Sequence, residues 1–263
     1  MRAAGAPLPA EFTRFSAGQT EIVCARQLAD ALRDIVARGT VYDYAAHHRS
    51  ARALVGRGTV YAVPLGGEHV VVRHNHHGGL LAPLTGDLFL APTNAPRELQ
   101  LSQQLLAHEV PTPVMLGYAL YRAQLGFCRV DVITREVPRS FDLSTALMSP
   151  DVAHRTIAIA AAADLVLALS AVGAHHADLN VKNILLHPSA KSDAALDAMV
   201  LDLDRVTFDE PEIVLELNLA RLLRSARKWQ RKHGARVTQA ELVELAESVR
   251  ERRPPPLAES ASS

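Results

Sequence analysis

The stretch His175–Arg205 reads HHADLNVKNILLHPSAKSDAALDAMVLDLDR and predicts, in order, a loop, a strand, a turn, a second strand and a carboxylate. Asp178 and Asn183 stand in it as D-x-x-x-x-N, directly before the apolar triplet 184–186. After a loop with Pro and Ser, a second short apolar run ends at Asp202. Two acids and an amide at this spacing are what phosphoryl transfer needs.

Phosphoryl transfer explains why these residue types occur together. The γ-phosphoryl group of ATP passes through a charge-dispersed transition state, so catalysis consists mostly of positioning and of charge neutralisation by Mg²⁺. Asp178 would lie beside the incoming hydroxyl, whereas Asn183 and Asp202 would hold the metal through hard oxygen ligands. The structural alternative is a polar turn between two buried strands.

The stretch resembles the protein-kinase signature H-R-D-L-x-x-x-N followed by D-F-G. It differs at Ala177, where the signature has Arg, and at Leu203 and Asp204, where it has Phe and Gly. In the form H-x-D-L-N-x-x-N-I-L-L followed by D-x-D-R, it is similar to the bacterial lipopolysaccharide kinases, specifically the 3-deoxy-D-manno-octulosonic acid (Kdo) kinases. The matching positions are His176, Asp178, Leu179, Asn183 and Asp202.

Composition indicates a globular chain without a global charge bias. The 263 residues are 48% hydrophobic and 21% charged, with a formal net charge of zero, which gives no reason to expect nucleic acid as a partner. Cys24 and Cys128 lack metal-site spacing and suit a reducing cytosol. No apolar run precedes Glu11, so no secretory signal is expected. The apolar run 157–172 is interrupted by Asp164 and predicts a buried helix.

Residues 53–73 predict three antiparallel strands that would cover the nucleotide. Gly56 and Gly58 lie in the first turn, where a missing Cβ lets backbone N–H groups approach phosphates, although Gly-x-Gly is also common in plain hairpins. Arg73 ends the third strand where kinases carry a phosphate-binding Lys, and R-H-N-H-H-G-G-L is similar to R-H-Y-R-R-G-G-L of Kdo kinases. Glu98, in the first turn of the next helix, would pair with Arg73. The alternatives are a solvated Arg and a Glu that only stabilises the helix dipole.

The resemblance implies an α+β, bilobal protein-kinase-like fold with an antiparallel-sheet N-lobe and a mainly helical C-lobe. A proline-containing link at 135–138 would be the hinge. The expected parts are residues 1–52 as an N-terminal extension, 53–137 as the N-lobe, 138–251 as the C-lobe and 252–263 as a disordered tail.

A basic helix is predicted near the C-terminus. Residues 221–236 hold seven basic and no acidic side chains, with Trp229 between them. Such a helix either lies with a solvated face on the C-lobe or contacts anionic lipid headgroups. The residues that would make this membrane contact are Arg221, Arg224, Arg227, Lys228, Arg231 and Lys232.

The resemblance implies ATP- and Mg²⁺-dependent phosphorylation of the 4-hydroxyl of Kdo linked to lipid A, peripherally on the inner face of the inner membrane. Asp178 would be catalytic, Asn183 and Asp202 would hold the metal, and Arg73 with Glu98 would serve the nucleotide. Alternative functions are phosphorylation of a heptose, a small alcohol or a protein, and a pseudokinase scaffold. The absence of an A-P-E segment argues against a conventional protein kinase.

Overall fold

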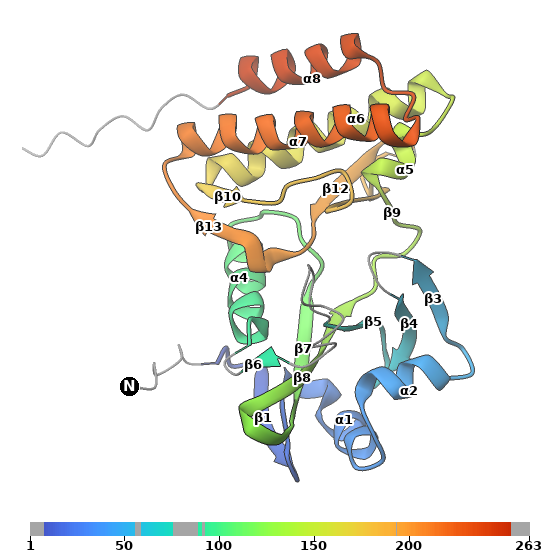
Figure 1. Ribbon diagram of the computed structural model, residues 1–263, viewed down its shortest axis with the longest axis vertical. Coiled ribbons are helices and arrows are strands. Elements are labelled where there is room, and N and C mark those ends of the chain that lie inside the picture. The colour runs from blue at the N-terminus through green and yellow to red at the C-terminus, as the bar shows by residue number, and fades with distance from the viewer. Residues whose placement is uncertain (1–7, 56–58, 76–88, 91–92, 193, 254–263) are drawn as a thin grey trace, which may run out of the picture. The chain divides into compact units, whose positions relative to one another are not determined.

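The chain folds into two compact units, shown by a computed structural model (Figure 1). Unit 1 combines Met1–Gln100 with Val114–Glu136, and unit 2 combines Leu101–Pro113 with Val137–Ser263. The structure describes residues 8–55, 59–75, 89–90, 93–192 and 194–253. Gly56 and Gly58, predicted to approach phosphates, lie outside these described residues.

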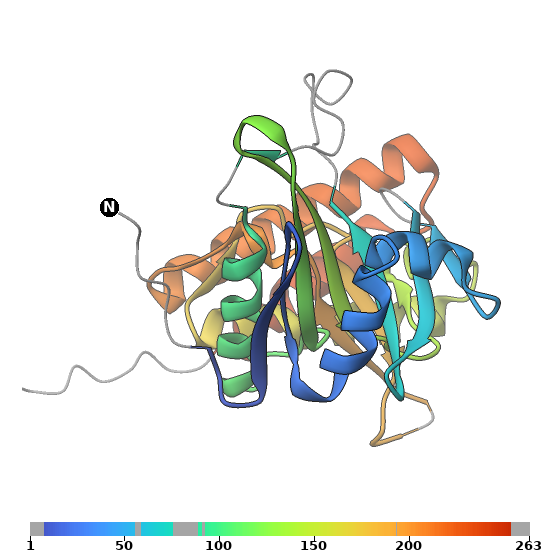
Figure 2. The same cartoon turned by 90° about the horizontal axis from the view of Figure 1, so that it is seen from below.

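Unit 1 is built on one antiparallel sheet in the order β1-β2-β7-β8-β5-β4-β3, with β6 beside β8 (Figure 2). The three strands predicted over 53–73 are confirmed as β3, β4 and β5. Gly66 and Gly67 join β4 to β5 with φ of 57° and 84°, the two-residue turn that matches the twist of a hairpin. The strands are β1 (Phe12–Ala17), β2 (Thr20–Ala25), β3 (Arg52–Val55), β4 (Thr59–Leu65), β5 (Glu68–His74), β6 (Phe89–Leu90), β7 (Met115–Arg122) and β8 (Phe127–Arg135).

The N-terminal residues belong to the same sheet. β1 and β2 form a hairpin whose inner strand pairs with β7, so Ile22, Val23 and Cys24 are buried in the core of unit 1. Thr40 caps α2 by accepting a hydrogen bond from the Asp43 N–H group at 2.9 Å. The helices that begin in unit 1 are η1 (Arg26–Leu28), α1 (Ala29–Val36), α2 (Val41–His47), α4 (Ala95–Ala107) and η2 (Gln124–Gly126).

Unit 2 is organised around α6 (Val152–Ala171), the long Ala/Leu-rich helix predicted from the sequence. Ten of its residues are buried, and Asp151 caps its first turn through the Ala153 N–H group at 2.9 Å. Gly173 follows the helix with φ of 67°, and a Cβ there would collide with the carbonyl oxygen of Asp209. Gly173 therefore lets the chain turn sharply from α6 into the strand that precedes the D-x-x-x-x-N loop.

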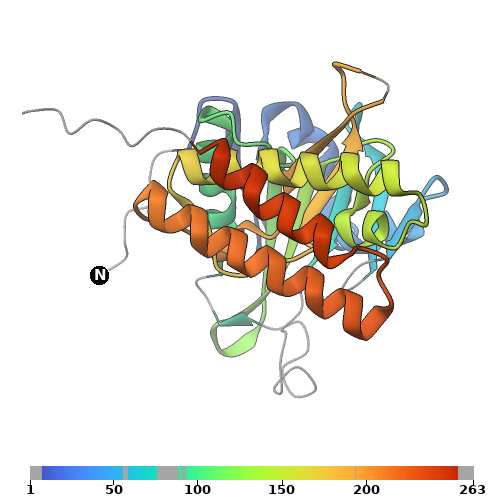
Figure 3. The same cartoon turned by 90° about the horizontal axis from the view of Figure 1, so that it is seen from above.

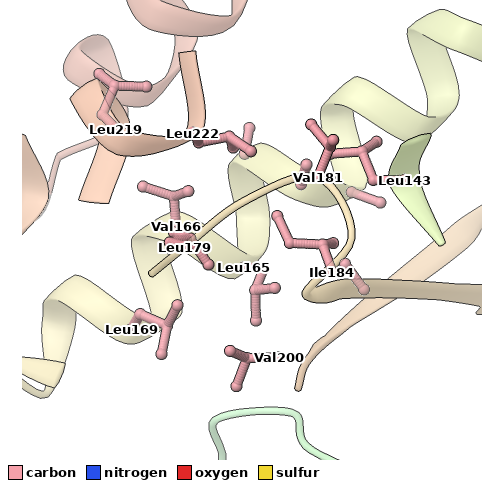
Figure 4. Close-up of a cluster of buried hydrophobic side chains, with 14 of the residues drawn as sticks. Leu143, Leu165, Val166, Leu169, Leu179, Val181, Ile184, Val200, Leu219 and Leu222 are labelled. Carbon is pink, nitrogen blue, oxygen red and sulfur yellow. The ribbon is translucent and has the colours of Figure 1, made fainter. Parts of the chain in front are cut away.

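The other helices and two small sheets of unit 2 pack around α6. α8 crosses over α6 and α7 (Figure 3), and the core cluster of unit 2 includes side chains from these helices and from the loop before β11 (Figure 4). The remaining elements are β9 (Phe141–Asp142), α5 (Leu143–Leu147), β10 (Ala174–His176), β11 (Ile184–Pro188), β12 (Leu196–Val200), η3 (Leu203–Arg205), β13 (Val206–Phe208), α7 (Pro211–His233) and α8 (Gln239–Glu251). The sheets have the orders β12-β11-β9 and β10-β13.

An antiparallel sheet in unit 1 and a mainly helical unit 2 confirm the predicted α+β class. Among the described residues, α6 is the one helix long and apolar enough to span a membrane by length and composition. Core helices pass the same test, and α6 carries the core of unit 2.

Candidate active site

The β11–β12 hairpin brings the two predicted metal-binding residues together. Ile184 and Val200 are cross-strand partners, so Asn183 before β11 lies opposite the residue that follows β12. The Leu201 N–H group donates to the carbonyl oxygen of Asn183 at 2.9 Å. Asp202 therefore leaves the hairpin next to Asn183, although the two residues are 19 positions apart in the sequence.

His176 connects the loop at Asp178 to the same end of the hairpin. Its side chain is completely buried, its Nδ1 lies 3.2 Å from the Asp178 nitrogen, and its Nε2 lies 2.9 Å from the carbonyl oxygen of Leu201. A backbone N–H group can only donate and a carbonyl can only accept, so the ring proton lies on Nε2. One imidazole thereby fixes the backbone of Asp178 and of the residue before Asp202.

The side chain of Asn183 closes the loop that begins at Asp178. Its Nδ2 donates to the Asp178 carbonyl oxygen at 2.9 Å, and the Asn180 side chain donates to the same oxygen at 3.1 Å. Within the described part of the chain, Oδ1 of Asn183 accepts no hydrogen bond. This amide thus uses its nitrogen to hold the loop and presents its oxygen as a neutral donor of the kind that Mg²⁺ accepts.

Asp202 adopts a backbone conformation that is unfavourable for an L-residue. Its φ and ψ are 64° and 54°, in the left-handed region. Such a conformation costs about 1–3 kcal/mol and persists where surrounding contacts impose it, often at functional sites. Here the preceding residue, Leu201, is held at both its N–H and its carbonyl group by Asn183 and His176. Those two hydrogen bonds fix the backbone that leads into Asp202.

Asp204 has an ionic neighbour in the next residue. Its Oδ2 lies 3.8 Å from Nε of Arg205. One described carboxylate, Asp202, and one amide oxygen, Asn183, are the oxygen donors that the hairpin brings together. This small set fits Mg²⁺, which is commonly held by one or two carboxylates together with substrate phosphates. In the described residues, no group of three or more His, Cys, Asp and Glu side chains could hold a metal ion.

In unit 1, the expected ion pair between Arg73 and Glu98 is formed. Nη2 of Arg73 lies 2.7 Å from Oε1 of Glu98, which is 8% exposed in the first turn of α4. Because successive side chains of a strand point to opposite faces, the next residue of β5, His74, points away from α4. Its Nδ1 lies 2.6 Å from Oδ1 of the fully buried Asp131 on β8.

Asp131 also anchors α2 on the face of the sheet opposite α4. Its Oδ2 accepts hydrogen bonds from the Tyr42 N–H group at 2.9 Å and from the Tyr121 hydroxyl at 2.8 Å. The same Tyr121 hydroxyl accepts from the Val41 N–H group at 2.7 Å. The first two N–H groups of α2 are thereby satisfied from β7 and β8. On β5, Arg73 pairs with Glu98 of α4, whereas the His74 ring lies 5.3 Å from the Tyr42 ring of α2.

One residue that supports the D-x-x-x-x-N loop was not predicted from the sequence. Asn218 on α7 is fully buried; its Oδ1 accepts from the His176 N–H group at 3.0 Å and its Nδ2 donates to the Ala174 carbonyl oxygen at 2.9 Å. It therefore ties β10, which leads into the loop, to the core helix α7. A single Asn among Val214, Leu215 and Leu219 on the apolar face of a helix was the available signal.

The basic helix is confirmed as the C-terminal half of α7, and a groove of about 510 Å³ runs between it and α8. Leu223, Leu242 and Ala246 contribute apolar surface to the groove, and Arg224 and Arg231 contribute charge. Among the described residues, none of the six cations predicted to contact lipid has an ion-pair partner. The lining residues of this groove are separate from the catalytic loop.

Comparisons with known proteins identify the family of the chain. The sequence matches the lipopolysaccharide kinase (Kdo/WaaP) family over residues 44–244, which are 201 of its 263 residues. A search of curated protein sequences finds no match. The fold is similar to WaaP in complex with acyl carrier protein, at 14% identity over 84% of this chain and 95% of that chain, with a TM-score of 0.46. It is also similar to the BubR1 kinase domain, at 13% identity over 74% of this chain and 50% of that chain, with a TM-score of 0.40.

Proposed function

Because the chain belongs to the lipopolysaccharide kinase (Kdo/WaaP) family, and is thus a phosphotransferase, we propose that it transfers the γ-phosphoryl group of ATP to Kdo linked to lipid A. The hydroxyl phosphorylated is the one at the 4-position. One observation carries the proposal: hydrogen bonds place Asp178, Asn183 and Asp202 at one end of the β11–β12 hairpin. His176 contacts the backbone of Asp178 and of Leu201, and Leu201 in turn bonds to Asn183 and directly precedes Asp202.

Each residue of the site has one role in this reaction. Asp178 orients the acceptor hydroxyl and takes its proton as the new O–P bond forms and the bond to the leaving ADP oxygen breaks. Asn183 and Asp202 would hold Mg²⁺, which supplies charge neutralisation on the phosphates when it is bound. Arg73 binds the phosphates through its guanidinium group, and Glu98 fixes the orientation of that group.

Two other functions remain distinguishable by experiment. A kinase for a heptose, a small alcohol or a protein would use the same residues with another acceptor. A pseudokinase scaffold would bind its partner without turnover and need not bind nucleotide in a metal-dependent way. Calorimetric titration of ATP with and without Mg²⁺ separates the scaffold from the enzymes, because only an active site requires the metal for tight nucleotide binding.

The acceptor assignment is tested with a panel of purified acceptors. The protein is incubated with ATP and Mg²⁺ together with Kdo-lipid A, lipid A without Kdo, a heptose or a small alcohol, and phosphate incorporation is followed by mass spectrometry. The proposal predicts one phosphate added to Kdo-lipid A and none to lipid A. Phosphate on lipid A itself, or only on a heptose or a small alcohol, would contradict the Kdo assignment.

We also propose that the protein works at the cytoplasmic face of the inner membrane, where α7 contacts anionic lipid. A positively charged helix attracts anionic headgroups by about 1 kcal/mol for each basic residue near the surface. On the same helix, Ile213 and Leu217 are 49% and 43% exposed and share one face at i,i+4 spacing. Apolar side chains beside a cationic row suit the boundary between headgroups and acyl chains.

Sedimentation with vesicles tests this contact. Wild-type protein should pellet with vesicles of phosphatidylglycerol and phosphatidylcholine and remain in the supernatant with phosphatidylcholine alone. The double variant Arg224→Glu/Arg231→Glu should lose this binding, whereas Arg26→Glu, an exposed arginine in unit 1, should keep it. Equal binding of wild type and the double variant would exclude α7 as the contact.

A further inference from the structure

At Val181, the catalytic loop is held between two helices of unit 2, α5 and α7. The N–H group of Ser144, in the first turn of α5, donates to the carbonyl oxygen of Val181 at 3.0 Å. The N–H group of Val181 donates to the hydroxyl oxygen of Ser225 on α7 at 3.2 Å. The Val181 side chain is 1% exposed in the core cluster drawn in Figure 4, together with Leu143 and Leu222.

The next residue, Lys182, joins the same two helices through its side chain. Its Nζ lies 2.9 Å from Oδ2 of Asp142, the residue that caps α5, and 5.4 Å from the ring centroid of Trp229 on α7. Trp229 is half-buried against the core and stacks on His233 one turn later, with centroids 4.0 Å apart. An ammonium group near an aromatic face is attracted by the ring quadrupole.

Asp142 is a rigid partner for the ammonium group. Its Oδ1 accepts hydrogen bonds from the Ser144 hydroxyl and from both the N–H and the hydroxyl of Thr145, which leaves Oδ2 for Lys182. Burial raises the pKa of Asp142, but the contact with Lys182 and the hydrogen bonds from Ser144 and Thr145 outweigh it, so the pKa lies below its usual value. The carboxylate is therefore charged and fixed at neutral pH.

A small movement of Lys182 would also move the neighbouring site residues. It lies directly before Asn183 and four residues after Asp178, and its own N–H group donates to the Asn180 side chain at 2.9 Å. An exposed ion pair contributes little to stability, and Lys182 is 38% exposed at its side chain. The contact is thus better suited to fixing the geometry of the loop than to stabilising the fold.

We propose that Lys182 is a positioning residue, held between Asp142 and Trp229, that fixes the loop carrying Asp178 and Asn183 and so sets the rate of phosphoryl transfer. The rate effect rests on the proposed function, whereas the clamp itself does not. Lys182 acts through the loop backbone, so its loss should affect kcat more than KM for ATP. Displacement of a catalytic group by about 1 Å can lower a rate by about a hundredfold.

Two measurements on matched variants test the clamp and the rate separately. Lys182→Met keeps the aliphatic stem and removes the charge, and Lys182→Arg keeps the charge. Lys191→Met removes an exposed lysine on the β11–β12 turn whose side chain makes no hydrogen bond or ion pair within the described residues. Hydrogen exchange of the peptide covering 178–183 is followed for each protein, together with kcat and KM. This exchange does not depend on any acceptor.

In Lys182→Met, amide exchange in this peptide should rise about tenfold, kcat should fall about ten- to a hundredfold, and KM for ATP should change by a smaller factor than kcat. Lys182→Arg should restore most of the wild-type exchange rate and most of the wild-type kcat, and Lys191→Met should match wild type in both. Unchanged exchange in Lys182→Met would overturn the clamp, and faster exchange with unchanged kcat would overturn the effect on rate. If wild-type protein phosphorylates no acceptor, the proposed function fails while the exchange data still decide the clamp.

Discussion

Asp202 and Asp178 should respond differently to the loss of one charge. Asp202→Asn removes the carboxylate proposed to hold Mg²⁺, so Mg²⁺-dependent ATP affinity should fall about ten- to a hundredfold, the equivalent of a lost contact to a charged group. Asp178→Asn, which keeps a similar shape beside the acceptor, should leave that affinity nearly unchanged. Calorimetry of both variants with ATP and Mg²⁺ measures the difference. Equal losses in the two variants would contradict the assignment of separate roles.

Asn218 gives a second test at the level of one residue. Asn218→Ala would leave the buried His176 N–H group and the Ala174 carbonyl oxygen without a partner. Each unsatisfied buried group costs about 1–3 kcal/mol, so the free energy of unfolding should fall by about 2–4 kcal/mol in denaturant titration. Leu217→Ala, at the exposed neighbouring position on α7, should change it by less than about 0.5 kcal/mol. Similar effects of the two substitutions would contradict the structural role of Asn218.

The residues of the site were predictable where the signal is local in the sequence. The D-x-x-x-x-N spacing and the carboxylate after the second strand lie within one stretch, so Asp178, Asn183 and Asp202 could be named before the fold was known. The strand-end Arg73 and the first-turn Glu98 were named from kinase order. Their proposed roles stay predictions, but the ion pair expected between Arg73 and Glu98 is formed.

Among the elements, α8 is fastened to α6 by a buried ion pair. Arg155 Nε lies 3.0 Å from Oε1 of Glu241, with side chains 6% and 12% exposed, and Glu241 also completes the capping box of α8 with Thr238. Breaking such a pair leaves an uncompensated buried charge and costs about 3–5 kcal/mol. Arg155→Ala should therefore lower the free energy of unfolding by about this amount, whereas Arg252→Ala, which breaks an exposed pair with Asp164, should have little effect.

The same pair should make stability depend on pH in the acid range. Burial raises the pKa of Glu241, but hydrogen bonds from Thr238 and the pair with Arg155 outweigh it, so the pKa lies below the ordinary value of 4.5. A lowered pKa adds stability above the ordinary value and loses it as pH falls through the folded-state pKa. Denaturant titrations from about pH 6 to about pH 3 should show a smaller loss for Glu241→Gln than for wild type. Parallel curves would contradict this role of Glu241.

Most helices and strands could be predicted from the sequence, but the contacts between them could not. The strands over 53–73, the buried helix at the apolar run 157–172 and the basic C-terminal helix follow hydrophobic period and turn residues, and they are confirmed. The β1–β2 hairpin was missed because its short alternating runs lie in residues 1–52, which were predicted only as an N-terminal extension. Pairs such as Lys182 with Asp142, 40 positions apart, depend on the tertiary fold and have no local signature.

At the scale of the whole molecule, the predicted kinase-like α+β class is confirmed, and the family match covers most of the chain. The two cores divide along the same boundary as the two units, since α4 contributes Leu99 to the first and Leu101 to the second. Length and composition could predict two parts of this kind. That residues 101–113 belong to unit 2 could not be predicted, because it depends on which core buries each turn of α4.

The proposed reaction of this chain is phosphorylation of Kdo through the loop at Asp178. The most direct test incubates Kdo-lipid A with ATP, Mg²⁺ and either wild-type protein or Asp178→Asn, and locates any added phosphate by fragmentation mass spectrometry. We predict one phosphate on the 4-position of Kdo with wild type, and turnover lower by at least about a hundredfold in the variant, the range of a lost general base. Phosphate elsewhere on the acceptor, or equal turnover by the two proteins, would contradict the claim.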